Sequence, residues 1–162
     1  MVYRPWIFAI TPFLQTLVYM IWETLQKVLG KWNFDREIII AEDGGTMGIN
    51  WYVDSDGVGR PVFKEGEKPK PILILVPGLG GGSTNMYTHA LARVAQLRGF
   101  KCGTALFRCS PTLPITSVKL TCSTSWEDID EIVDYVHNRY VIDPVTKEKR
   151  VRFYGYGTSL GA

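Results

Sequence analysis

The sequence has few of the residues from which metal sites and disulfide frameworks are built. It contains two histidines and three cysteines, Cys102, Cys109 and Cys122, in 162 residues. The odd number of cysteines and the lack of a Cys-x-x-Cys spacing argue against both a zinc site and a set of structural disulfides. We expect Cys102 to be a small core residue in a strand, and the other two cysteines to lie in a loop as inert thiols.

The chain also lacks an excess of either charge. Eighteen basic and sixteen acidic residues give a net charge of +2, which indicates no nucleic-acid partner and no acidic tail. The glycine-rich segment Pro77–Ser83 does not end in Gly-Lys-Ser/Thr and does not have the Gly-x-Gly-x-x-Gly spacing. It therefore does not predict a nucleotide-binding loop.

No uninterrupted apolar run is long enough for a clear membrane span. The segment Trp6–Trp22 is mainly apolar but contains Thr11, Pro12, Gln15 and Thr16, whereas a spanning helix needs about 20 predominantly apolar residues. No small-residue cleavage site follows, so we do not expect a secretory signal. We expect residues 1–30 to be an N-terminal apolar helix, either packed on the domain or associated with a membrane surface. The chain would accordingly be membrane-associated or cytoplasmic.

The remaining residues, 31–162, read as one α/β domain that ends at a sharp turn. Apolar runs and turn residues predict alternating strands and helices, and this order is typical of a parallel sheet covered on both faces. The expected elements are a helix at 13–29, a hairpin at 37–42 and 47–53, a solvated loop at 54–71, a strand at 72–76, a helix at 85–98, a strand at 101–107, a helix beginning at 124 and a strand at 151–156.

The sequence Gly157-Thr158-Ser159-Leu160-Gly161 directly follows the last expected strand. Gly-x-Ser-x-Gly in that position is the pattern of a nucleophile elbow, a strand-to-helix turn that exposes a serine hydroxyl above a sheet. The glycines are needed because the strained backbone leaves no room for a Cβ. Ser159 is therefore the candidate nucleophile, with Gly157 and Gly161 as the elbow glycines.

The segment Pro77–Gly82 follows the first buried strand and supplies a second candidate element. Acyl transfer develops negative charge on a carbonyl oxygen, and two fixed backbone N–H groups can stabilise that charge. In this arrangement one N–H belongs to the residue after the nucleophile, Leu160, and the other to the earlier loop. We assign the second N–H to Leu79, with Gly78 and Gly80 as the glycines that allow close approach.

Neither histidine suits a catalytic triad. His89 and His137 both precede Ser159, whereas the order in this architecture is Ser, then Asp or Glu, then His. Both lie in expected helices on the flanks of the sheet, so we read them as packing or surface residues. Asp128, Asp130 and Asp134 read as solvated helix charges.

These motifs together resemble the α/β-hydrolase-fold esterases and lipases of the AB-hydrolase type-4 family. Phe13–Leu17 is similar to a His-Leu-Gln-Thr-Leu segment of that family, and Pro77–Ser83 is similar to its His-Gly-Leu-x-Gly-Gly-Ser oxyanion loop. Further matches are Arg36-Glu37 with Asp43-Gly44-Gly45 and Trp51 in the opening hairpin, Phe107-Arg108 at a strand end, Trp126–Ile129 at a helix start, and the elbow.

The resemblance also shows departures from the family pattern. Phe13 and Pro77 stand where the family has histidine, and Cys109 and Ala162 stand where it has glycine. It implies that the chain corresponds to the N-terminal half of the fold, and that the triad acid and histidine lie beyond residue 162.

We therefore expect a serine carboxylester hydrolase that acts on acyl esters, with acylglycerols or phospholipids as candidate substrates and with no metal or cofactor. This chain alone would be weakly active at most. The alternative is a non-catalytic hydrolase-fold protein that associates with partners. It could do so by self-association through the apolar edge strand 151–156.

Overall fold

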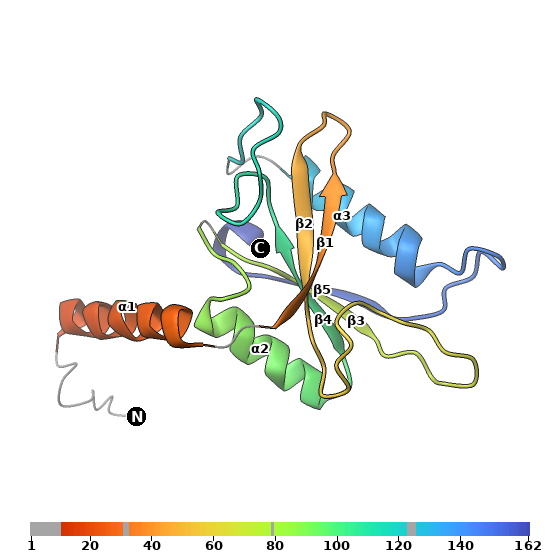
Figure 1. The fold of residues 1–162 in the computed structure, drawn as a ribbon, viewed down its shortest axis with the longest axis horizontal. Coiled ribbons are helices and arrows are strands. Elements are labelled where there is room, and N and C mark those ends of the chain that lie inside the picture. Colours follow the sequence, from red (N-terminus) through yellow and green to blue (C-terminus); the bar gives the residue numbers. More distant parts are fainter. Residues whose placement is uncertain (1–10, 31–32, 79, 123–125) are drawn as a thin grey trace.

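Among the residues that the structure describes, five strands form one mixed sheet with helices on both faces (Figure 1). The structure is a computed structural model that describes residues 11–30, 33–78, 80–122 and 126–162. The strand order across the sheet is β1-β2-β4-β3-β5. The strands are β1 (Phe34–Ile40), β2 (Thr46–Tyr52), β3 (Ile72–Val76), β4 (Lys101–Leu106) and β5 (Phe153–Gly157).

The sheet combines the expected hairpin with the expected parallel units. β1 and β2 pair antiparallel through a turn at Gly44, whose φ of 80° favours glycine. β2 pairs antiparallel with β4, and β3 pairs parallel with both β4 and β5. The strands of the hairpin begin and end slightly earlier than the sequence predicts, and β5 begins two residues later. The parallel strands thus bring their carboxyl ends to one edge of the sheet.

The continuous apolar run of β3 lies between two core clusters. Ile72, Ile74 and Val76 pack with α3 (Glu127–Val136) and the π-helical turn His137–Val141 that follows it. Leu75 packs on the opposite face with Ala92 of α2 (Met86–Leu97) and with Cys102. This alternation confirms a strand buried on both faces. It also confirms Cys102 as a core residue, where burial raises the pKa of its thiol to about 12.

The helices differ from expectation in two places. The apolar periodicity of residues 85–98 predicts a core face that includes Val94 and Leu97. In α2, however, the residues buried against the sheet are Thr88 and Ala92, and Val94 and Leu97 are exposed. Small residues allow the helix to lie close to the strands, so the core face is set by size rather than by hydrophobicity. In α3, Trp126 is the N-cap and makes no side-chain capping bond. The spacing of Thr124 and Glu127 predicts a capping box at this helix start, but Thr124 and Ser125 lie outside the described residues.

A buried carboxylate joins the hairpin to α3 and the π-helical turn. Glu37 of β1 is 5% exposed and accepts hydrogen bonds from Trp51 Nε1 at 2.8 Å, from Tyr135 at 2.8 Å and from Tyr140 at 2.9 Å. These three donors lie in the core or pack against it, so this network fixes where α3 crosses the sheet.

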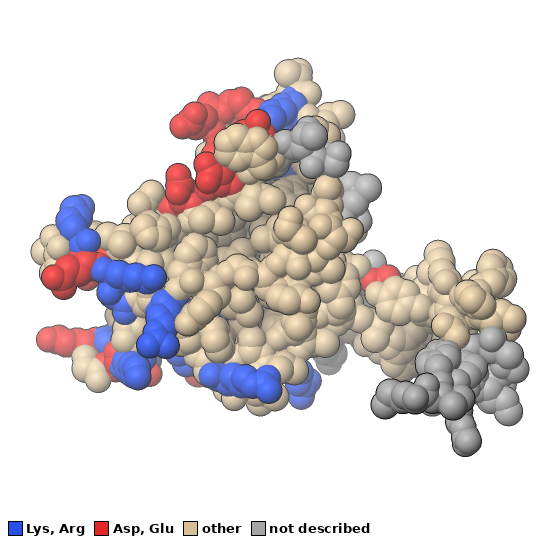
Figure 2. Space-filling view, turned by 180° about the vertical axis from the view of Figure 1, so that it is seen from behind, with Lys and Arg blue, Asp and Glu red and all other residues tan. Residues whose placement is uncertain are grey.

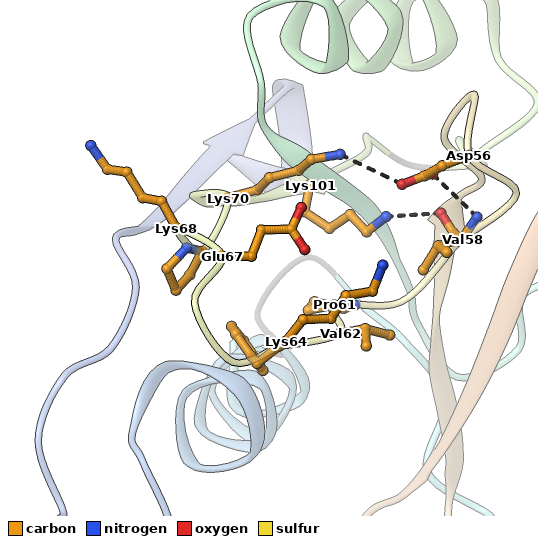
Figure 3. A pocket seen from close by; sticks show the side chains of 11 residues that line it. Asp56, Val58, Pro61, Val62, Lys64, Glu67, Lys68, Lys70 and Lys101 are labelled. Carbon is orange, nitrogen blue, oxygen red and sulfur yellow. Dashed lines mark hydrogen bonds and ion pairs between the residues drawn. The ribbon is translucent and has the colours of Figure 1, made fainter.

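The loop 54–71 contains neither helix nor strand, as the sequence predicts. It encloses a small pocket of about 60 Å³ at the start of β4, where Lys101 donates to the Val58 carbonyl at 2.8 Å (Figure 3). The Lys101 and Lys70 ammonium groups both donate to Asp54, at 2.7 and 3.0 Å. Because Lys101 begins β4, this pocket lies at the end of the sheet opposite to the carboxyl ends of the parallel strands.

Helix α1 (Pro12–Leu29) projects from the body of the molecule beyond the start of α2 (Figure 1). Thr11 caps it by accepting the Leu14 N–H at 3.3 Å. Within the ranges that the structure describes, no helix combines the length and apolar character that crossing a bilayer requires.

Candidate functional site

Ser159 lies on a sharp turn at the carboxyl end of β5. Its φ is 56°, in the left-handed region that non-glycine residues rarely adopt, and the residue is exposed. The turn is fixed to the neighbouring strand because the Thr158 N–H donates to the Val76 carbonyl at 3.1 Å. A single 3₁₀ turn, Ser159–Gly161, follows. A strained, exposed serine directly after a parallel strand is the geometry of a nucleophile elbow.

The glycines around Ser159 are required by close backbone contacts. A Cβ on Gly157 would lie 1.9 Å from the Gly161 carbonyl oxygen, and a Cβ on Gly161 would lie 2.4 Å from the Val76 carbonyl oxygen. A Cβ on Gly78 would lie 3.1 Å from the Ser159 Cβ. The three predicted glycines therefore allow β3, β5 and the turn to meet.

The loop after β3 lies directly against the serine. Its Gly78 N–H donates to the Tyr87 hydroxyl at 3.4 Å, and the Gly81 N–H donates to the Gly78 carbonyl at 2.9 Å. Gly80 has a φ of 68°, which suits glycine. Leu79, which we expected to provide one oxyanion N–H, lies outside the described residues, and that role stays a prediction.

Leu160, the other expected oxyanion donor, lies next to this loop. Within the described part of the chain, its N–H donates to no protein acceptor, whereas the N–H groups of Thr158, Gly161 and Ala162 all do. A backbone N–H beside the nucleophile that the fold does not use is available to a ligand oxygen.

Two hollows meet at the glycine loop. One, of about 280 Å³, lies between the loop, Leu160 and the segment after β4; Gly78, Gly80, Phe107, Cys109 and Ser110 are among its lining residues. The other, of about 400 Å³, shares Gly80, Gly81, Ser110 and Pro111 with the first and extends to Asn50 and Asn85. Small-molecule sites in such sheets form at this edge.

A buried arginine network that sequence reasoning missed supports the wall of the first hollow. Arg108 donates to both carboxylate oxygens of Asp128 at 2.7 Å, and to Asp43 at 2.6 Å. The hydrogen bonds that Arg108 donates to Asp128 raise the pKa of Arg108, and the hydrogen bond that it donates to Asp43 lowers the pKa of Asp43. The next residue, Cys109, has a φ of 62°, so the chain turns away from β4 directly after this anchor.

The prediction that Asp128 is a solvated helix charge is wrong. Its side chain is 0% exposed, whereas Asp130 and Asp134 on the same helix are exposed as expected. A signal was present in the sequence, since Arg108 directly follows a buried strand and a charge there needs a partner. The partner lies 20 residues further along the chain, and local periodicity cannot identify it.

The two histidines lie away from the two hollows at the glycine loop. His89 is half-buried in α2 with its ring centroid 6.0 Å from that of Tyr52, and burial followed by the charge of Arg93 lowers its pKa. The His137 carbonyl accepts the Ile142 N–H at 3.0 Å within the π-helical turn. Neither lines either hollow. Among the described residues, no cluster of His, Cys, Asp and Glu could hold a metal ion.

Curated proteins that resemble this chain are longer than it is, and the similarity covers only part of each of them. No family model matches. The chain is 29% identical over 129 residues to Embryogenesis-associated protein EMB8 of Picea glauca, which covers 78% of this chain and 26% of that protein. It is 23% identical over 128 residues to Phospholipase ABHD3 of Mus musculus, covering 79% and 28%. The chain thus spans about a quarter of the length of these curated relatives.

The solved structures establish the fold. The Pyrococcus furiosus esterase Pf2001 superimposes with a TM-score of 0.54 at 16% sequence identity, covering 84% of this chain and 45% of the esterase. The mixed sheet with helices on both faces agrees with this likeness. The chain has an α/β-hydrolase-like fold, as the sequence predicts.

The elbow geometry predicts different effects for two glycines of β5. We expect Gly157→Ala to break the Thr158–Val76 hydrogen bond, because the new Cβ would lie 1.9 Å from the Gly161 carbonyl oxygen. The Thr158 amide should then exchange with solvent at least roughly tenfold faster, measured by hydrogen-exchange NMR. Gly155→Ala is the matched control, since its Cβ meets nothing within 4 Å. Equal Thr158 exchange in both variants would contradict the close packing of the elbow.

The arginine network predicts a similar contrast on α3. Asp128→Asn removes a buried charge from Arg108 and should lower the free energy of unfolding by about 3 kcal/mol, because it leaves the guanidinium poorly compensated. Asp130→Asn, on the exposed side of the same helix turn, should change it by less than about 0.5 kcal/mol. Urea unfolding followed by circular dichroism measures both. Overlapping unfolding curves for the two variants would show that the pair contributes little.

Proposed function

We propose that this chain carries the nucleophile and oxyanion-hole part of a serine carboxylester hydrolase. The observation that carries the proposal is Ser159 itself, exposed at a φ of 56° on a turn that only glycines on both sides can form. A purely structural turn has no need for a serine in a strained conformation. Its position at the carboxyl edge of the parallel strands, next to Leu160, which lines the 280 Å³ hollow, also supports this function.

In the proposed reaction, the Ser159 Oγ attacks the carbonyl carbon of an acyl ester and forms a tetrahedral intermediate. The N–H groups of Leu160 and Leu79 would stabilise the oxyanion, and the alcohol would leave to give an acyl-enzyme that water hydrolyses. A histidine must accept the serine proton and an acid must orient that histidine. By the order typical of this fold, both would follow Ser159 in the sequence of the whole protein.

Two observations support a substrate class: the names of similar proteins and the lining of the hollow beside Leu160. One of the curated relatives is named as a phospholipase and one of the solved structures as an esterase. The hollow beside Leu160 is lined largely by glycine backbone and by Phe107, Cys109 and Pro111. This apolar lining suits an acyl chain. We therefore propose acyl esters, including acylglycerols or phospholipids, as substrates.

Fluorophosphonate labelling tests the proposal, because these reagents phosphonylate activated serines. The protein is expressed in its source cells, treated with the reagent and mapped by peptide mass spectrometry. We expect an adduct on Ser159 that is lost in Ser159→Ala. Ser110→Ala is the matched control, since Ser110 also lines the hollow beside the elbow and should leave the adduct unchanged. An unlabelled Ser159, or an adduct that persists in Ser159→Ala, would refute the proposal.

A second candidate is a non-catalytic role in association. Within the described sheet β5 pairs with β3 alone, and its Tyr154 and Tyr156 are 43% and 46% exposed. An edge strand with exposed aromatic residues can pair with another chain, including a second copy of this one. An unlabelled Ser159 would favour this second function over hydrolysis.

A further inference from the structure

The 400 Å³ hollow at the glycine loop is lined by an arginine whose two hydrogen-bond acceptors are uncharged. Arg36 of β1 lines this hollow together with Asn50 and Thr112. Its Nε donates to the Asn50 side-chain oxygen at 2.8 Å, and its Nη1 donates to the Thr112 carbonyl at 2.9 Å. The guanidinium is therefore held between two other lining residues.

Arg36 differs from other arginines of the fold in its partners. Arg60 donates to Asp35 at 2.7 Å, and Arg108 donates to Asp128 at 2.7 Å. Within the ranges that the structure describes, Arg36 takes part in no ion pair, and only its Nε and Nη1 donate to protein acceptors. A guanidinium has five N–H donors, so the Nη2 group remains for a ligand.

The position of this guanidinium is fixed relative to the glycine loop. Asn50 is 3% exposed and donates to the Ser83 Oγ at 2.6 Å. Ser83 ends the glycine-rich segment 77–83, and its carbonyl accepts the Tyr52 hydroxyl at 3.0 Å. Asn50 thus binds Arg36 through its oxygen and the end of the loop through its nitrogen. Because buried networks of this kind are rigid, a group bound to Arg36 would have a defined place beside the loop.

The two hollows at the loop are lined by positive charge and by no negative charge. They have four lining residues in common. Among the described residues that line them, the charged ones are Arg36 and Arg108. Arg108 is already paired with the Asp128 carboxylate. An anionic group that enters the hollows therefore meets one uncompensated cation, Arg36.

This positive charge is separate from the main group of basic residues on the face that Figure 2 shows. Most Lys and Arg side chains of that face lie at the end of the body away from α1. The hollow lies near α1, because its lining residue Asn85 donates to Glu23 of that helix, and Glu23 does not itself line the hollow. Salt screens exposed charges beyond about 8 Å, so the attraction should depend on Arg36.

We propose that the 400 Å³ hollow is a subsite for an anionic group of the ester substrate, and that Arg36 selects anionic over neutral esters. The anionic group is a phosphate or a carboxylate, which a guanidinium binds through parallel N–H···O bonds. With its ester carbonyl at Ser159 and Leu160, such a substrate would lie across the glycine loop. This inference rests on the proposed function, since the anion belongs to the ester that is hydrolysed.

A purely structural role for Arg36 leads to a different expectation. Its bonds to Asn50 and Thr112 join β1 to the segment after β4. Loss of these bonds alone would change the hydrolysis of charged and uncharged esters together. An anion subsite instead changes the ratio between them, so this ratio is the quantity to measure.

The whole protein, purified from its source cells, is assayed with the hexanoyl esters of glycerol, of glycerol phosphate and of glyceric acid. The readout is kcat/KM for each anionic ester divided by kcat/KM for the neutral one. We expect Arg36→Gln to lower this ratio at least roughly tenfold, because a charge-assisted hydrogen bond is lost. Arg36→Lys should keep part of the preference, since it retains the charge without the planar donors. Circular dichroism checks that the variants are folded.

The matched control is Arg98→Gln at the end of α2, which removes the same charge from an exposed residue that lines neither hollow. We expect it to leave the ratio unchanged. A fall for the phosphate ester alone, or for the carboxylate ester alone, would support the subsite and identify the anion that it binds. Equal ratios in Arg36→Gln and Arg98→Gln would overturn the proposal, as would an unchanged protein that prefers neither anionic ester.

Binding without turnover separates this inference from the proposed hydrolysis. In the Ser159→Ala variant, isothermal titration calorimetry with the two anionic esters should give a Kd at least roughly tenfold higher for one or both when Arg36→Gln is added. Binding that depends on Arg36 in a protein without esterase activity would refute the hydrolase and keep the subsite. Equal Kd values with and without Arg36→Gln, or no binding of either ester, would overturn the subsite and leave the labelling of Ser159 as evidence for the hydrolase.

Discussion

The backbone of Gly161 lies so close to the end of β3 that a Cβ there would sit 2.4 Å from the Val76 carbonyl oxygen and 2.8 Å from that of Pro77. This contact brings the Ser159 turn and the glycine loop together, since both follow strands that pair in parallel. A larger residue would separate them, and Ser159 would lose the neighbouring N–H groups of Leu160 and the loop. The chemistry that we propose therefore depends on backbone packing between two adjacent strands.

Contacts of Arg108, Tyr87 and Asn85 hold the segments around the Ser159 turn in position. The Arg108–Asp128 pair anchors the segment after β4 that forms one wall of the hollow. Tyr87 at the start of α2 accepts the Gly78 N–H, and Asn85 holds Gly82 on one side and α1 on the other. The glycine loop, which lacks side chains of its own to pack, is thus positioned by residues of α2. The conformation of the glycine loop is therefore fixed by hydrogen bonds to Tyr87 and Asn85.

Much of the fold and the core of the candidate site could be predicted because their signals are local. The apolar run Ile72–Val76 and the Gly-x-Ser-x-Gly pattern each report a backbone conformation within a few residues. The partner of Arg108 could not be predicted, because Asp128 in a helical pattern looks like any exposed acid. The buried face of α2 was misjudged since packing selected Thr88 and Ala92 over the larger Val94 and Leu97.

If Ser159 and the glycine loop form one reaction site, both must contact the same reacting group. A crystal structure of the whole protein after reaction with a phosphonate ester shows whether they do. We predict that phosphorus is bonded to the Ser159 Oγ and that a phosphonyl oxygen accepts the Leu160 N–H together with an N–H of the loop between Gly78 and Gly82. A phosphonate on another serine, or an adduct on Ser159 with its oxygen turned to solvent, would contradict the account.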